Sequence, residues 1–187
     1  MLKIKKILVP TDLNDKSLAG IKYSMSLARE HGAEVVVLHV MDERVVPMTT
    51  LMPADEALFV ETNWFSIEQE TRHLVETAIE RGERRLFDFL ERHFGPELPH
   101  SVTLAARLGE VTEEIVNVAC SEGCDLIVMA SRGKGWLTRA VSGSMTERVA
   151  REAPCPVVTI QPDAVVREDG KWIAADSLAL GETSTAV

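Results

Sequence analysis

The chain has 187 residues, of which 45% are hydrophobic and 26% are charged, and its formal net charge at pH 7 is −9. These values are typical of one soluble globular domain with a sizeable core. The negative charge argues against nonspecific binding to nucleic acid, whose phosphates it would repel. A small anionic ligand stays compatible with it, because a local cradle of backbone N–H groups outweighs a distant field.

Targeting and redox signals are weak. The first apolar run, Ile7-Leu8-Val9, ends at Pro10 and is far too short for a signal peptide or a membrane span. The three cysteines are odd in number and sparse, which fits a reduced compartment, and we expect a cytoplasmic protein. Cys120 and Cys124 are about one helical turn apart without a matching pair of ligands, so we interpret them as structural.

In chain order, the first elements alternate between strand and helix. Lys6–Val9 is expected to be a short buried strand. Asn14 is a suitable N-cap for a helix over Asp15–His31, and Gly32 follows as a stop. Glu34–Val40 holds a nearly continuous apolar run, which predicts a strand covered on both faces.

Residues 42–66 form an insertion that is longer than most connections in compact domains. It is also too apolar for a disordered linker, so we expect a partly helical excursion that packs on the domain or on a partner. A long amphipathic helix is predicted over Ser66–His93, with Gly95-Pro96 ending it.

The second half continues the alternation. It predicts a strand, a helix, a strand, a helix and a strand over Ser101–Arg107, Glu110–Glu122, Asp125–Ala130, Gly143–Glu152 and Val157–Ile160. Five strands with long crossovers predict an α/β fold: a five-stranded parallel sheet with helices on both faces, of Rossmann-like type. In such sheets ligands bind outside the carboxyl ends of the strands, where the strand order switches.

The domain is expected to span residues 1–161, followed by an extension over 162–187. Asp169-Gly170 between β-prone residues predicts a small hairpin over Val165–Ala174. We expect disorder after about Gly181.

Two common phosphate-loop motifs are missing from the sequence. It has no Gly-x4-Gly-Lys-Ser/Thr, and Gly133-Lys134-Gly135 has Thr138 where a dinucleotide motif needs its third glycine. What is present is Ala130-x2-Gly133-x9-Gly143-Ser144, running from a strand through a loop to a helix N-terminus. The glycines allow close backbone approach, and a helix N-terminus offers N–H donors and about half a positive charge to an anion.

With these motifs the chain resembles the universal stress protein family, whose nucleotide-binding members carry Gly-x2-Gly-x9-Gly-Ser/Thr after the fourth strand. The flanking segments are similar too: Ile7-Leu8-Val9-Pro10-Thr11-Asp12, Leu38-His39-Val40, and Gly143 to Val149 running into Ala153 to Val158. The resemblance covers about Lys3 to Gln161. Its one departure in the loop is Ala130 in place of the first glycine, and alanine adopts positive φ only at a cost.

The resemblance implies ATP or AMP, with or without Mg²⁺, as the ligand. Asp12 would meet the ribose or base, and the Val40 backbone would read the adenine edge. Ala130 and its neighbours would lie under the sugar and phosphates, and Ser144 with its neighbours would hold phosphate. The full set of site residues is Pro10, Thr11, Asp12, Val40, Met129, Ala130, Arg132, Gly133, Gly143, Ser144 and Met145. The resemblance also implies a homodimer paired through the edge strand Val157–Ile160.

The same residues also allow purely structural interpretations. Asp12 could serve only as a turn or helix cap, Ser144 only as an N-cap, and Arg132, Lys134 and Arg139 only as a solvated rim. His39 is interpreted as a packed, hydrogen-bonded histidine rather than a catalyst.

Three functions remain open at this stage. The first is a nucleotide-sensing module that is not an enzyme, and the second is a slow ATPase or nucleotidyl-transfer enzyme. The third is a dimeric interaction protein with an empty site. The enzyme lacks support because no general base is evident, and only Asp12 and Asp42 are available as carboxylates for Mg²⁺.

Overall fold

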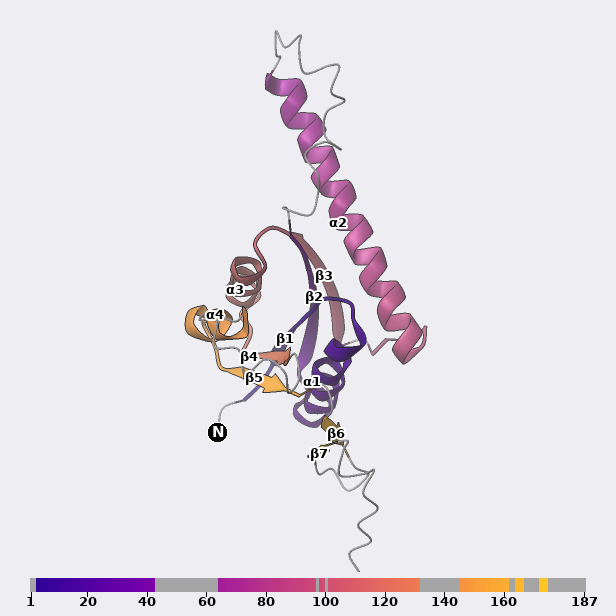
Figure 1. Ribbon diagram of the computed structural model, residues 1–187, viewed down its shortest axis with the longest axis vertical. Helices are drawn as coiled ribbons and strands as arrows, with labels where there is room; N and C mark the ends of the chain where they lie inside the picture. The colour runs from indigo at the N-terminus through magenta and orange to yellow at the C-terminus, as the bar shows by residue number, and fades with distance from the viewer. Residues whose placement is uncertain are drawn as a thin grey trace, which may run out of the picture.

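The computed structural model describes residues 3–42, 64–96, 98–99, 101–131, 145–161, 164–166 and 172–174. Its centre is a five-stranded parallel sheet in the order β3-β2-β1-β4-β5 (Figure 1). The strands are β1 (Lys6–Thr11), β2 (Glu34–Met41), β3 (Val102–Leu108), β4 (Leu126–Ala130) and β5 (Val157–Ile160). The predicted sheet is confirmed.

Helices cover both faces of this sheet, as predicted. They are the 3-10 helix η1 (Asp15–Ser17) and the α-helices α1 (Leu18–His31), α2 (Trp64–Phe94), α3 (Val111–Ser121) and α4 (Met145–Glu152). Helices α1 and α2 lie on one face, and α3 and α4 lie on the other (Figure 1). The molecule is therefore a three-layer α/β domain.

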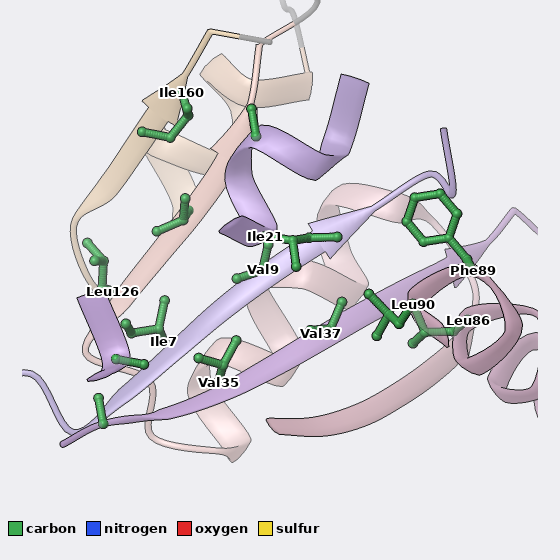
Figure 2. Close-up of a cluster of buried hydrophobic side chains, with 14 residues drawn as sticks. Ile7, Val9, Ile21, Val35, Val37, Leu86, Phe89, Leu90, Leu126 and Ile160 are labelled. Atoms are coloured by element: carbon green, nitrogen blue, oxygen red, sulfur yellow. The ribbon is translucent and has the colours of Figure 1, made fainter. Parts of the chain in front are cut away.

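The alternation of side chains along each strand builds two separate cores. On β2, Val35 and Val37 point to the α1–α2 face, whereas Val36 and Leu38 point to the α3–α4 face. Figure 2 shows the first of these cores, in which Leu90 of α2 lies beside Val37, with Leu86 and Phe89 in the same cluster. Covering both faces explains why the strands are apolar at nearly every position.

Strand order reverses at the centre of the sheet. From β1 the chain builds outward to β2 and β3, and then crosses back to place β4 and β5 on the other side of β1. The β1–β4 pairing runs over Ile7↔Leu126 and Leu8↔Ile127. The crevice between the carboxyl ends of β1 and β4 is thus the switch point at which such sheets bind ligands.

The start of the first helix differs from the prediction. Asp15–Ser17 is a 3-10 turn, and the α-helix begins at Leu18. The cause is Ser17, whose backbone N–H and hydroxyl both donate to the Asn14 carbonyl, at 3.0 and 2.7 Å, and so tighten the turn. Asn14 is the cap that the sequence predicted, because its side chain accepts from the Lys16 N–H at 2.8 Å.

Other boundaries shift by a few residues. Strand β1 continues two residues past the predicted end, because Pro10 and Thr11 still pair with β2. The residue Glu110, which was expected inside α3, is instead its N-cap and accepts from the Glu113 N–H at 2.8 Å. Its carboxylate also meets Arg148 of α4 at 3.2 Å, which ties the two helices on that face together.

Helix α2 has 31 residues and is the longest element. Its C-terminal part packs on β2 and β3, and its N-terminal part extends past the sheet (Figure 1). The helix packs closely on β2 at Gly82, where an added Cβ would lie 2.7 Å from the Met41 side chain. The insertion preceding α2 lies, for residues 43–63, outside the described residues.

After the sheet, β6 (Ala164–Val166) and β7 (Trp172–Ala174) pair in antiparallel fashion, with Val165 opposite Ile173. The predicted Asp169-Gly170 turn and the segment after 174 lie outside the described residues. None of the described helices is both long enough and apolar enough to span a membrane.

Candidate functional site

A cavity of about 230 Å³ opens at the carboxyl ends of β1, β2 and β4. We call it the switch-point pocket. Its described lining residues are Pro10, Thr11, Asp12, Asn14, Lys16, Ser17, Leu38, Val40, Val111, Ile115, Met129, Ala130, Ser131 and Met145. Every predicted site residue that the structure describes is among them.

The rest of the predicted site lies outside the described residues. Arg132, Gly133, Gly143 and Ser144 belong to the segment 132–144, as do Lys134 and Arg139. The described chain stops at Ser131 and resumes at Met145, and both of these residues line the switch-point pocket. The two ends of the predicted phosphate loop therefore meet at this pocket.

One side of the pocket, which we call the apolar wall, is formed by Leu38, Val40, Val111, Ile115, Met129 and Met145. These side chains belong to the α3–α4 core or pack against it. The wall is thus a continuation of the core to the edge of the sheet, where the strands end. Such a surface suits one face of a flat, weakly polar ring.

The other side, the polar wall, is formed by Thr11, Asp12, Asn14, Lys16 and Ser17. A short hydrogen-bond network fixes it. The hydroxyls of Thr11 and Ser17 are 2.7 Å apart, and Thr11 Oγ1 also accepts from the Leu13 N–H at 3.1 Å.

Backbone strain accompanies this network. Leu13 has φ of 61°, and it is the only non-glycine with positive φ in the described part of the chain. Strain of this kind costs of order 1–3 kcal/mol and gathers at functional sites. The polar wall is therefore a preformed structure that the surrounding contacts hold in place.

Asp12 caps a turn and also lines the pocket. Its carboxylate accepts from the backbone N–H of Asn14 at 3.4 Å and from the Asn14 side-chain amide. The turn-capping interpretation is thus borne out. The side chain is nevertheless exposed at the pocket, and an ionised carboxylate has about four acceptor positions, so it can also meet a hydroxyl of a ligand.

Ala130 lies at the end of β4 with its methyl group directed toward α1. Alternation places Leu126 and Val128 in the α1–α2 core and Met129 in the α3–α4 core, so Ala130 follows the first pair. A Cβ built on Gly20 of α1 would lie 3.8 Å from the Ala130 Cβ and 3.4 Å from its backbone nitrogen. The methyl group occupies space that Gly20 leaves open, and Ala130 does not need positive φ here.

His39 is packed and hydrogen-bonded, as interpreted from the sequence. It is 7% exposed, and its Nδ1 lies 3.0 Å from the Thr11 carbonyl oxygen. Burial lowers the pKa of His39, with a smaller contribution from Arg85, and the Thr11 contact and Asp12 oppose this in part. The ring therefore ties β2 to the last residue of β1, just behind the polar wall.

The cysteines lie away from this pocket. Cys124 is buried beside α3, and burial raises the pKa of its thiol to about 11, which keeps it protonated. Cys120 is exposed. Within the described ranges, no group of three or more His, Cys, Asp or Glu side chains could hold a metal ion.

Sequence reasoning missed several lining residues. Lys16 and Ser17 come two and three residues after the predicted N-cap Asn14, and their place at the pocket depends on the 3-10 turn that they form. Val111 and Ile115 have the spacing of core positions on a helix, and they serve both core and pocket.

Comparisons with known proteins identify the family. A sequence model of the Universal stress protein family matches residues 3–161. The chain is 33% identical over 157 residues to the universal stress protein MJ0531 of Methanocaldococcus jannaschii, covering 84% of this chain and 82% of that protein. It is 30% identical over 159 residues to the universal stress protein YxiE of Bacillus subtilis, covering 83% and 98%.

Solved structures agree in fold. The structure of MJ0577, a universal stress protein from Methanocaldococcus jannaschii, matches with 28% identity and a TM-score of 0.53, covering 86% of this chain and 97% of that one. The UspA structure from Lactobacillus plantarum matches with 24% identity and a TM-score of 0.53, covering 86% and 99%. The sheet, the switch-point pocket and the family match together show that this chain belongs to the universal stress protein family.

Proposed function

We propose that this protein binds an adenine nucleotide in the switch-point pocket and acts as a sensing or interaction module controlled by that ligand. The observation that carries the proposal is the meeting of three strand ends around one cavity with an apolar wall and a polar wall. A nucleotide has the same division, because its base is flat and weakly polar while its sugar and phosphates are hydrophilic.

The base would lie against Leu38, Ile115 and Met129 on the apolar wall. The Val40 backbone would then be placed to read the edge of the adenine, and Asp12 would accept from a ribose hydroxyl. Pro10 and Thr11 would close the floor between these two groups, since they are the last two residues of β1 and line the pocket.

The phosphates would lie toward the segment 132–144 and the start of α4. Helix α4 begins at Met145, which lines the pocket, so its first N–H groups would be available to an anion bound there. Gly133, Gly143 and Ser144 are proposed to add backbone and hydroxyl donors there. Arg132 would add positive charge.

A fold neighbour supports an adenine ligand. A universal stress protein solved in complex with cAMP has the same fold, with a TM-score of 0.51 and 16% identity, covering 86% of this chain and 99% of that chain. For our chain we extend this to ATP or AMP, with Mg²⁺ as an accompanying ion when ATP is bound.

The described lining residues favour binding over catalysis. They include neither histidine nor cysteine, and Asp12, their one carboxylate, is held by Asn14. A general base needs to reach the proton that it abstracts, and among the described lining side chains only Asp12 and Lys16 are of a type that acts in this way. We therefore assign the ligand a regulatory role.

We also propose a homodimer through β5. This strand is at the edge of the sheet, where it pairs with β4 alone among the described strands. An apolar edge strand is usually paired or covered. Light scattering at micromolar concentration should give the mass of two chains, and the mass of one chain would contradict the assignment.

Thermal unfolding with added nucleotide tests the proposed function. A ligand at about 100 times its Kd stabilises by roughly 2.7 kcal/mol, so ATP or AMP should raise the Tm while GTP at the same concentration should do so far less. No shift at millimolar adenine nucleotide would contradict binding. Phosphate release that Ser144→Ala abolishes would instead favour an ATPase.

A further inference from the structure

We propose that Lys16 contacts the phosphate chain of the ligand and makes the switch-point pocket prefer polyphosphorylated nucleotides to less charged ones. This inference rests on the proposed nucleotide-binding function and assigns a specificity-determining residue to it. Lys16 lies outside the Ala130-x2-Gly133-x9-Gly143-Ser144 motif and belongs to η1, which follows β1 in the chain.

The charge of the pocket points to Lys16. Among the described residues that line the cavity, it has the only cationic side chain, and Asp12 has the only carboxylate. The protein has a formal net charge of −9, which disfavours any approaching polyanion. A cation at the pocket is therefore needed more in this chain than in a neutral one.

The backbone of Lys16 is fixed while its ammonium group stays available. Its N–H donates to Asn14 Oδ1 at 2.8 Å, and the following residue, Ser17, is buried and bonded to Thr11. Within the described ranges, no carboxylate forms an ion pair with the Lys16 Nζ, and the side chain is exposed at the pocket.

The neighbouring carboxylates are engaged elsewhere. Asp12 accepts two hydrogen bonds from Asn14. Asp15 is directed toward α2, where its Oδ1 lies 3.5 Å from the Nε2 of His93. Among the described residues, neither carboxylate forms an ion pair with the Lys16 Nζ, and Lys16 lines the cavity.

The position of η1 places Lys16 near the crevice between β1 and β4. Helix η1 follows β1 and contacts β4, and Ser131 follows the last residue of β4, so Lys16 and Ser131 both line the cavity at the β1–β4 crevice. The apolar wall lies on the α3–α4 face. A nucleotide whose base rests on that wall extends its phosphates into the crevice, between Lys16 and Ser131.

The experiment measures Kd by calorimetry for ATP, AMP, adenosine and inorganic tripolyphosphate with the full chain. The variants are Lys16→Ala, Lys16→Arg and the control Lys22→Ala, which removes the same charge from an exposed position on α1 outside the pocket. We expect Lys16→Ala to weaken ATP and tripolyphosphate about tenfold, AMP less, and adenosine less than twofold, since a charge-assisted contact is lost. Lys16→Arg should restore most of the ATP affinity, and Lys22→Ala should leave all four ligands within twofold.

Several results would overturn the inference. Equal weakening of adenosine and ATP by Lys16→Ala would mean that Lys16 shapes the pocket instead of contacting phosphate. Equal weakening of ATP binding by Lys22→Ala and Lys16→Ala would mean that Lys16 acts only through the net charge of the protein. If the parent chain binds tripolyphosphate through Lys16 but no adenosine compound, the nucleotide assignment fails and the Lys16 assignment stands; if it binds none of the four, both fail.

Discussion

The two walls of the switch-point pocket are built by different physics. The apolar wall is the end of the α3–α4 core, and its side chains are placed by strand alternation and helix packing. The polar wall runs from Thr11, the last residue of β1, to Ser17, the last residue of η1, and it is placed by local hydrogen bonds. Changes to the apolar wall should therefore alter stability and binding together, whereas on the polar wall a change at the exposed Lys16 should alter binding alone.

The largest effect is expected at Ile115, which is fully buried and lines the pocket. Ile115→Ala removes core contacts and should lower the free energy of unfolding by about 2–5 kcal/mol. The same change should weaken nucleotide binding, because the ring loses part of its support. Urea unfolding and calorimetry on one preparation measure both quantities, and a loss in only one of them would break the link between core and pocket.

Next in size is Ser17→Ala on the polar wall. It removes the partner of the Thr11 hydroxyl and the bond to the Asn14 carbonyl, and should cost about 1–3 kcal/mol. The matched control is Ser24→Ala, which removes a buried hydroxyl bonded to the Gly20 carbonyl at 2.9 Å on α1. Both variants should lose similar stability, and only Ser17→Ala should also lose nucleotide affinity. An equal loss of affinity in the two variants would contradict a distinct role for the polar wall.

A smaller effect is expected from pH. Burial lowers the pKa of His39 in the folded chain from the ordinary value of 6.5. As the pH falls, the imidazole is therefore protonated in the unfolded chain before it is protonated in the folded chain. The contribution of His39 to stability is complete above pH 6.5, falls as the pH drops from there to the folded-state pKa, and is constant below it. The groups acting on the ring are Arg85 and Asp12.

The variant His39→Asn isolates this contribution, because asparagine keeps a donor near the Nδ1 position and does not titrate in this range. The difference in unfolding free energy between the parent and His39→Asn should become smaller as the pH falls from 7 to 5. A difference that stays constant across that range would exclude His39 as the source.

The smallest effect is expected for Ala130→Gly. Because the methyl group of Ala130 points toward Gly20, its removal should change nucleotide affinity less than threefold. Gly20→Val is the informative partner, since branched side-chain atoms there would press on the end of β4 and weaken binding more. A large gain in affinity from Ala130→Gly alone would show that the methyl group obstructs the ligand.

Much of the fold could be predicted from the sequence. Helices cover both faces of the sheet, so the strands are nearly continuous apolar runs that can be recognised. Val157–Ile160 was predicted with the bounds that the structure has, since Pro156 and Gln161 flank a clear apolar run. The end of β1 was placed too early, because proline usually stops a strand. In the fold, Pro10 still pairs with Leu38 of β2.

The pocket was predictable in part. The residues at strand ends, such as Asp12, Val40 and Met129, could be found because parallel strands bring their carboxyl ends to one edge. Lys16 and Ile115 could not be assigned to the pocket in the same way. Their place depends on a 3-10 turn and on how far α3 reaches over the sheet, and neither is set by local sequence alone.

A crystal structure of the full chain with ATP tests the central claim most directly. We predict the adenine ring against Leu38, Ile115 and Met129, with the phosphates between Lys16 and the start of α4. Nucleotide bound at a different surface, or an unliganded switch-point pocket in crystals grown with ATP well above the concentration that saturates related sites, would contradict it.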